Sequence, residues 1–209
     1  MALTLFAKQG FQATTLRQIA ARVGLQVGSL YNHIKSKGDL LFEIMDAVLL
    51  DLLEEQRAVP ETPDADVRLS ALIHNHVRFH GERADEVFVG NSELRSLTTL
   101  QRGRIVTLRR EYEQLFQTVL EQGVQQDTFQ QMDAQTVAFG IIAMATSVSI
   151  WFSRNGRLSL EQVGDIYAAL TLRAIRNSAP KSGSRTACEP VPAASDGAGS
   201  VGQARRPAV

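Results

Sequence analysis

The chain is poor in the residues that hold together secreted and metal-binding proteins. Its 209 residues include one cysteine, Cys188, which excludes an intrachain disulfide and any zinc site built on cysteine pairs. Aromatic residues make up 6% of the chain, and no basic N-terminal segment precedes a long apolar run, so no secretory signal is visible. Phosphate-binding Gly-Lys-Ser/Thr loops, Gly-x-Ser-x-Gly turns and His-Glu-x-x-His helices are also missing. We therefore expect a cytosolic protein that is not an enzyme and needs no cofactor.

Acidic residues are absent before Asp39. Five basic residues occur in that segment. The rest of the chain contains the other 17 basic residues and all 22 acidic residues, so a net charge of zero combines a basic N-terminus with an acidic remainder. The five are Lys8, Arg17, Arg22, Lys35 and Lys37. A short basic segment of this kind favours a polyanionic partner, with nucleic acid as the first candidate.

Hydrophobic residues make up 44% of the chain, which excludes a wholly disordered protein, but they are unevenly distributed. Residues 178–209 hold four of the six prolines and four of the 15 glycines, and we expect this tail to be disordered. In residues 2–177, apolar residues recur at helical spacing, and no segment alternates long enough to indicate a strand. The predicted fold is all-α, divided into a head (residues 1–41), a body (residues 42–177) and the tail.

Capping patterns and apolar spacing place the helices of the body. Ser36 with Asp39, and Ser159 with Gln162, are typical of helix starts, because each pairs a hydroxyl with a polar side chain three positions later. The apolar stripes predict helices over 40–52, 69–80, 105–123, 134–153 and 160–175.

The segment 134–153 contains no charged residue over a length that would span a bilayer. It nevertheless includes Gln135, Thr136 and Thr146, and the neighbouring helices are amphipathic like those of soluble proteins. We therefore favour burial in a core or a subunit interface over a membrane span.

Residues 15–41 have the spacing of a helix-turn-helix. Thr15 and Gln18 match a capping box, and an apolar edge at i, i+3, i+4 and i+7 follows until Gly24, where a left-handed residue would end the helix. A second short helix is predicted over 26–34, with Leu30 and Ile34 available to pack inward. Two short helices joined by a glycine-containing turn form the motif that places its second helix in the major groove of DNA.

The outward positions of this second helix suit base recognition. Gln26, Asn32 and His33 carry donors and acceptors for base edges, and Gly28 lets the backbone approach the groove. Tyr31, Lys35 and Lys37 are candidates for phosphate contacts. Periodicity alone equally allows an ordinary solvated face.

The head resembles the N-terminal domain of the tetracycline-repressor (TetR) family. The residues that carry the resemblance are Leu5-Phe6, Gly10-Phe11, Thr14-Thr15, Ile19-Ala20, Val23-Gly24, Gly28-Ser29-Leu30-Tyr31-Asn32-His33, Ser36-Lys37 and Leu40-Leu41. The resemblance implies a homodimeric bacterial transcription regulator, usually a repressor, with a DNA-binding head and an all-α ligand-binding body. The DNA contacts implied by spacing and by the resemblance are Thr15, Arg17, Gln26, Val27, Gly28, Ser29, Tyr31, Asn32, His33, Lys35 and Lys37.

Three positions depart from the family pattern. Members carry ten or more residues before the position of Leu5, so we expect a truncated first helix and a weakened head core. Gln26 stands where the family has Ser or Thr, which removes a helix cap. Ile34 replaces a usual Phe, which a small core tolerates.

The body is similar, more loosely, to a branch of the family that answers to acyl-CoA thioesters and related lipid-like acids. This similarity covers Asn91 through Tyr112. The candidates for a ligand pocket, apolar walls with a few polar anchors, are Phe79, Phe88, Asn91, Glu93, Leu94, Tyr112, Phe116, Phe139 and Met144. Each of these aromatic residues can equally be ordinary core.

Three histidines lie close together in the sequence at His74, His76 and His80. His76 and His80 share a helix face, as two ligands of a metal would, but zinc needs three or four ligands and the stripe they occupy is apolar. We favour a hydrogen-bonded core or pocket role for them and expect no metal.

The resemblance also implies a dimer formed by the last two helices, and Gly140, Ala143 and Ala145 near Trp151 allow helices to approach closely. A two-fold dimer would hold two recognition helices ~34–36 Å apart and require a palindromic operator. An effector in the body would change that separation, with the helix over 37–57 as the connecting lever. The alternatives left open are a helical carrier or enzyme, and a ligand-binding protein whose DNA binding is impaired.

Overall fold

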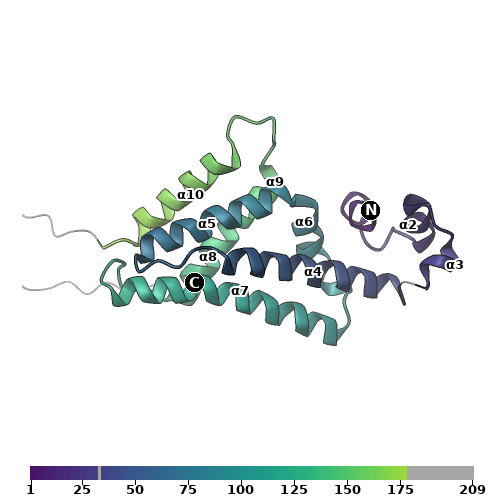
Figure 1. Ribbon diagram of the computed structural model, residues 1–209, viewed down its shortest axis with the longest axis horizontal. Helices are drawn as coiled ribbons and strands as arrows, with labels where there is room; N and C mark the ends of the chain where they lie inside the picture. Colours follow the sequence, from purple (N-terminus) through teal and green to yellow (C-terminus); the bar gives the residue numbers. More distant parts are fainter. Residues whose placement is uncertain (33, 178–209) are drawn as a thin grey trace, which may run out of the picture. The chain divides into compact units, whose positions relative to one another are not determined.

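The computed structural model describes residues 1–32 and 34–177, so the predictions for His33 and for the 178–209 tail lie outside the described residues. The elements in chain order are α1 (Ala2–Gln9), α2 (Leu16–Val23), α3 (Val27–Leu30), α4 (Lys37–Arg57), α5 (Ala65–Glu82), α6 (Ala84–Ser92), the 3-10 turn η1 (Leu94–Ser96), α7 (Thr99–Gln125), α8 (Ala134–Thr146), α9 (Val148–Trp151) and α10 (Leu160–Ile175) (Figure 1). Within these ranges no β-strand occurs, which confirms the all-α prediction.

The helix-turn-helix has the local chemistry that its sequence predicts. The Thr15 hydroxyl accepts a hydrogen bond from the Gln18 amide while the Gln18 side chain accepts from the Thr15 amide, a complete capping box. Gly24 ends α2 in the left-handed conformation, with φ of 74°. α3 is shorter than the predicted 26–34, because Gln26 makes no side-chain cap and Gly28 weakens the helix centre.

α7 ends at Gln125, near Gly123 as predicted, and a Cβ at Gly123 would lie 2.0 Å from the Phe129 ring, so this glycine serves close packing. The apolar stretch after residue 134 is broken at Ser147 into α8 and α9. In the described residues Ala134–Trp151 is the one stretch long and apolar enough to cross a membrane; 22% of it is buried within this chain, and the break at Ser147 interrupts its helix.

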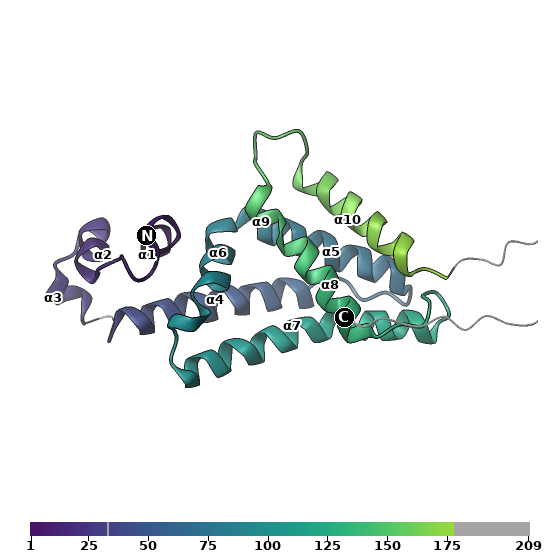
Figure 2. The ribbon, with the colours of Figure 1, turned by 180° about the vertical axis from the view of Figure 1, so that it is seen from behind.

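The body is built on α5, which packs against α7, α8 and α10, while α4 lies along α7 (Figure 1). α6 lies between α1 and α9 (Figure 2). Two hydrophobic clusters result. One fills the body around Leu72, Ile73 and Phe116, and the other fills the head around Phe6, Ile19 and Leu41.

The head core is completed from outside the head. Val89 of α6, Leu97 after η1 and Ile105 of α7 are buried in the same cluster as Phe6 and Leu41. The short helix α1 therefore packs on the body as well as sharing a cluster with α2 and α4. These contacts bury apolar surface that so small a head could not bury by itself.

Candidate functional sites: a helix-turn-helix surface and a helical cavity

The predicted DNA-contact residues occupy one exposed part of the head. Seven of them are exposed, namely Thr15, Arg17, Gln26, Gly28, Tyr31, Asn32 and Lys35. Val27, Ser29 and Lys37 are half-buried, and His33 is outside the described residues. The polar groups of α3 and the turn after it are thus open to solvent, as base recognition requires.

Among the described residues, no carboxylate forms an ion pair with a cation of the head. Each of the nine ion pairs that the described residues form involves positions from Asp46 onward. Arg17 and Lys35 therefore present their charge to solvent, while Asp39 is occupied by Ser36 and by Gln101 of α7. This part of the surface attracts a polyanion.

Lys37 is held by the turn between α1 and α2. Its ammonium donates to the carbonyl oxygens of Phe11 at 2.7 Å and of Thr14 at 2.8 Å, and lies 4.3 Å from the centre of the Phe11 ring. A third, longer contact reaches the Gln12 carbonyl at 3.4 Å. The three donors of an ammonium group are thereby engaged, so the structure gives Lys37 a role in fixing this turn, and its phosphate contact stays a prediction.

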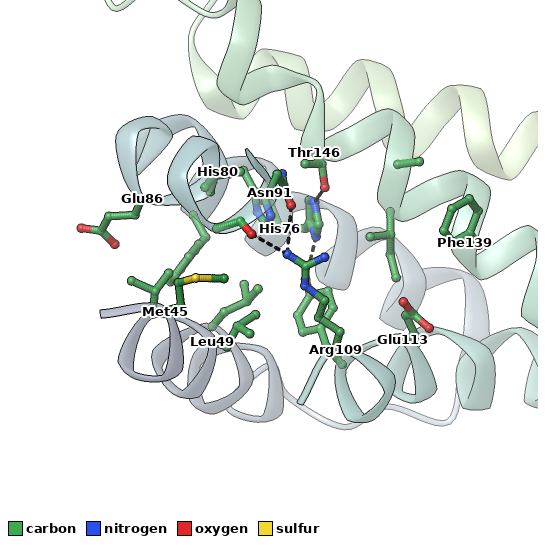
Figure 3. Close-up of a pocket in the computed structure, with 18 residues that line it drawn as sticks. Met45, Leu49, His76, His80, Glu86, Asn91, Arg109, Glu113, Phe139 and Thr146 are labelled. Carbon is green, nitrogen blue, oxygen red and sulfur yellow. Dashed lines mark hydrogen bonds between the residues drawn. The ribbon is translucent and has the colours of Figure 1, made fainter. Parts of the chain in front are cut away.

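A cavity of about 270 Å³ lies in the body, between α4, α5, α6, α7 and α8 (Figure 3). Most of its wall is apolar and is formed by Met45, Val48, Leu49, Leu52, Phe79, Val87, Phe139, Ile142 and Ala143. Its polar groups are His76, His80, Glu86, Asn91, Arg109, Tyr112, Glu113 and Thr146. An apolar chamber with a few polar groups is typical of a small-ligand site.

The structure brings four of the predicted ligand residues to this cavity, namely Phe79, Asn91, Tyr112 and Phe139. Phe116 is fully buried in the body core, beside Tyr112. Phe88 is exposed, Leu94 packs against the head cluster, and Glu93 binds the head. Met144 does not line the cavity.

His76 and His80 form a stacked pair on the cavity wall. Their ring centres are 3.7 Å apart with an interplanar angle of 11°. Burial holds the pKa of His76 well below its usual value, the neighbouring His80 lowers it further, and burial lowers the pKa of His80 to about 4. Both rings are therefore neutral at neutral pH, and they stack instead of converging on a point where a metal would sit.

Arg109 links the cavity to the end of α6. Its guanidinium donates to the Gly90 carbonyl at 2.9 Å and to the Asn91 side-chain oxygen at 3.2 Å (Figure 3). Burial lowers the Arg109 pKa, and the charge of nearby Glu113 opposes that shift. Glu86, at the other end of the cavity in Figure 3, has a pKa raised by burial and pairs with Arg83 at 2.7 Å.

The cavity and the head are connected through two helices. Met45 of α4 is buried in the head cluster and also lines the cavity. At the end of α6, the Glu93 carboxylate accepts a hydrogen bond from the Phe11 amide at 3.3 Å, only two residues after Asn91. Helix positions that line the cavity are therefore adjacent to positions that contact the head.

Sequence reasoning missed the cavity roles of Arg109, Glu113 and Glu86. Charged residues on amphipathic helices are expected in solvent, and their spacing alone does not say which of them turns inward. The signal for the histidines was present, because His76 and His80 interrupt an otherwise apolar stripe.

Comparisons with known proteins match both parts of the chain to one family. Residues 1–44 match the family described as bacterial regulatory proteins, tetR family, and residues 62–175 match the tetracyclin repressor-like C-terminal domain. The transcriptional repressor KstR2 of Mycolicibacterium smegmatis is 30% identical over 181 residues, which is 85% of this chain and 88% of that protein.

Two solved structures share the fold over most of their length. The ketosteroid transcriptional regulator KstR2 of Mycobacterium tuberculosis superposes with a TM-score of 0.77 at 27% identity, covering 85% of this chain and 92% of that one. AibR, solved in complex with isovaleryl coenzyme A and operator DNA, superposes with a TM-score of 0.74 at 28% identity, covering 81% and 92%. The chain therefore belongs to the tetR family of bacterial regulatory proteins and is a ligand-responsive, DNA-binding transcriptional repressor.

Proposed function

We propose that this protein binds a palindromic operator as a homodimer and leaves it when a small, largely apolar effector occupies the body cavity. The observation that carries the proposal is the pairing of an exposed, cationic helix-turn-helix with an apolar cavity that shares α4 with it. The chain would work in the cytoplasm, divided functionally into residues 1–41 for DNA, residues 42–177 for effector and dimerisation, and the tail.

In this proposal some exposed polar groups of the head contact bases and others contact phosphates. Gln26, Asn32 and His33 would meet base edges together with the backbone at Gly28, whereas Arg17, Tyr31 and Lys35 would hold phosphates. The absence of carboxylate partners for the head cations among the described residues supports this division. Binding should weaken steeply with added salt, because each phosphate contact releases counterions.

The dimer would form through α8, α9 and α10. Large apolar side chains on these helices are exposed, namely Phe139, Ile150, Trp151, Ile166 and Leu170. Ile150 is 84% exposed, which is costly for an isolated monomer surface of this apolar character. A second copy covering these helices would remove that surface from water and set the two heads at the spacing of one DNA turn, ~34–36 Å.

The effector class that fits the cavity is a compact apolar or acyl-CoA-like molecule. The apolar wall suits an acyl chain or a fused hydrocarbon, and Arg109 is the one cation among the described lining residues. The AibR complex supports an acyl-CoA, since that neighbour was solved with isovaleryl coenzyme A. Occupation of the cavity would shift α4 at Met45 and α6 at Asn91, and through Met45 and Glu93 would move the head.

Selection of duplexes from a random pool by the purified chain tests the DNA half of the proposal. We expect an enriched palindrome whose half-sites are one helical turn apart. Asn32→Ala should weaken binding to that palindrome about five- to 100-fold, whereas the exposed Gln12→Ala in the turn before α2 should not. Equal affinity for the selected palindrome and a scrambled duplex at low salt would contradict it.

Release of the bound operator tests the effector half. Isovaleryl-CoA and a longer acyl-CoA should dissociate the complex, with coenzyme A alone as the control. If none of the three shifts operator affinity, the effector is not an acyl-CoA.

A further inference from the structure

His80 carries the one histidine nitrogen of the cavity that is left without a hydrogen bond among the described residues. The side chain lines the cavity, and the residue is only 6% exposed. Its Nδ1 lies 2.9 Å from the His76 carbonyl oxygen, which can only accept, so Nδ1 holds the ring hydrogen. In a neutral ring Nε2 is then a hydrogen-bond acceptor, and no donor among the described residues reaches it.

His76, in contrast, has both nitrogens engaged. Nδ1 lies 2.7 Å from the Tyr112 hydroxyl and Nε2 lies 3.0 Å from the Thr146 hydroxyl. A neutral ring has one hydrogen, so one hydroxyl donates to the ring and the other accepts from it. The hydroxyl that accepts keeps its own hydrogen, and burial, which raises the Tyr112 pKa well above its usual value, keeps the phenol protonated.

The histidine end of the cavity therefore offers a free acceptor on His80, whose ring stacks on His76 (Figure 3), and a hydroxyl bonded to His76 that can donate. We propose that this end recognises an alcohol group on an otherwise apolar effector, with the alcohol hydrogen donated to Nε2 of His80 and the alcohol oxygen accepting from Tyr112 or Thr146. An alcohol does both, whereas an ether or a ketone only accepts and leaves Nε2 without a donor. The inference rests on the proposed function only in taking this cavity as the effector site.

The charges around the cavity agree with a neutral group at this end. Arg109 is turned to the Gly90 carbonyl and to Asn91, Glu86 is paired with Arg83, and Glu113 faces Arg109. No cation among the described lining residues is hydrogen-bonded to either histidine. A carboxylate placed beside His80 would lack a counter-charge there, because the ring is neutral.

The test compares n-octanol with its isomer heptyl methyl ether, by calorimetric titration of the purified full chain. We expect the wild type to bind the alcohol about three- to tenfold more tightly than the ether, the range of one neutral hydrogen bond. His80→Phe keeps an aromatic ring but removes the acceptor, and should bring the ratio of the two dissociation constants to about one. His74→Gln changes the histidine of α5 that pairs with Asp165 away from the cavity, and should keep the wild-type ratio.

A measurement on the wild type keeps the test independent of variant folding. With nitrogen-15 in the histidines, the Nε2 signal of His80 should move towards that of a hydrogen-bonded nitrogen on addition of octanol and not on addition of the ether. Equal ratios in wild type and His80→Phe, failure of both probes to bind, or an unchanged Nε2 signal would each overturn the inference, the last because a water would already fill that acceptor.

The two proposals fail separately. Alcohol selectivity in a preparation that enriches no palindrome from the random pool would contradict the proposed operator binding and leave the alcohol site intact. Operator release by an effector without a hydroxyl, combined with a ratio of one in the wild type, would contradict only the alcohol site.

Discussion

The head and the body bury apolar surface in different ways. The head cluster has eleven buried residues, and four of them, Met45, Val89, Leu97 and Ile105, come from the body. The body cluster has 23 buried residues, drawn from α4, the segment after it, and every later long helix. The head therefore depends on local caps and on its contact with the body, whereas the body is stabilised mainly by packing between helices distant in sequence.

This difference fits the division of work in a repressor. A small unit held by a few capping bonds and by four side chains of the body can change its position at low energetic cost. A larger packed unit can hold a ligand cavity open without collapsing. Variants of the two regions should therefore differ in both the size and the nature of their effects.

The largest effect is expected in the body core. Phe116→Ala removes a fully buried ring that contacts Tyr112 and the His76 ring. Cavity formation should lower the free energy of unfolding by about 3–5 kcal/mol, measured by urea denaturation. A loss below 1 kcal/mol would show that the body repacks freely and would remove the contrast with the head.

Acidification should also act through the body. The pKa of His80 is about 4 in the folded chain against 6.5 for a free histidine, so between these values the unfolded chain binds the extra proton. Stability should therefore fall as the pH falls from about 6.5 to about 4, by about 3 kcal/mol for this residue. Urea midpoints over that range check this: His80→Phe should reduce the dependence, and buried His76, whose pKa is also lowered, should account for part of what remains. An unchanged dependence in His80→Phe would contradict the prediction.

Comparing Lys37 with Lys35 distinguishes a cation that stabilises the head from one that we propose contacts DNA. Lys37→Met removes the charge-assisted bonds to the Phe11 and Thr14 carbonyls and should lower stability by about 2 kcal/mol. The exposed Lys35→Met should leave stability unchanged but reduce the slope of operator affinity against salt by about one phosphate. Identical salt slopes and stabilities for the two variants would contradict the assignment.

The smallest effect is expected at a helix cap. Thr15→Ala breaks the capping box of α2 and should cost about 1 kcal/mol of stability. Hydrogen exchange of the α2 amides should speed up while that of α5 does not. Faster exchange in α5 as well would show that the head and body unfold as one unit.

Most of the helical architecture was predictable because it depends on neighbours in sequence. The capping boxes at Thr15 and Ser159 and the left-handed Gly24 involve residues a few positions apart, and the structure confirms all three. The break at Ser147 and the packing of the Phe129 ring on Gly123 were not predictable. The Gly123 case depends on the Phe129 ring, and no spacing rule reports that contact.

Of the two candidate sites, the helix-turn-helix surface was predictable from local sequence and the cavity was not. The helix-turn-helix surface is defined within two dozen residues, so the order of amino acids already determines which side chains α3 and its flanking turns present. The cavity draws its wall from five helices, and only their packing decides that Arg109 and His80 face the same space while Phe88 faces water. Neighbouring positions on a helix point in different directions. Which of them is buried depends on contact with other helices, and a local sequence pattern does not contain that information.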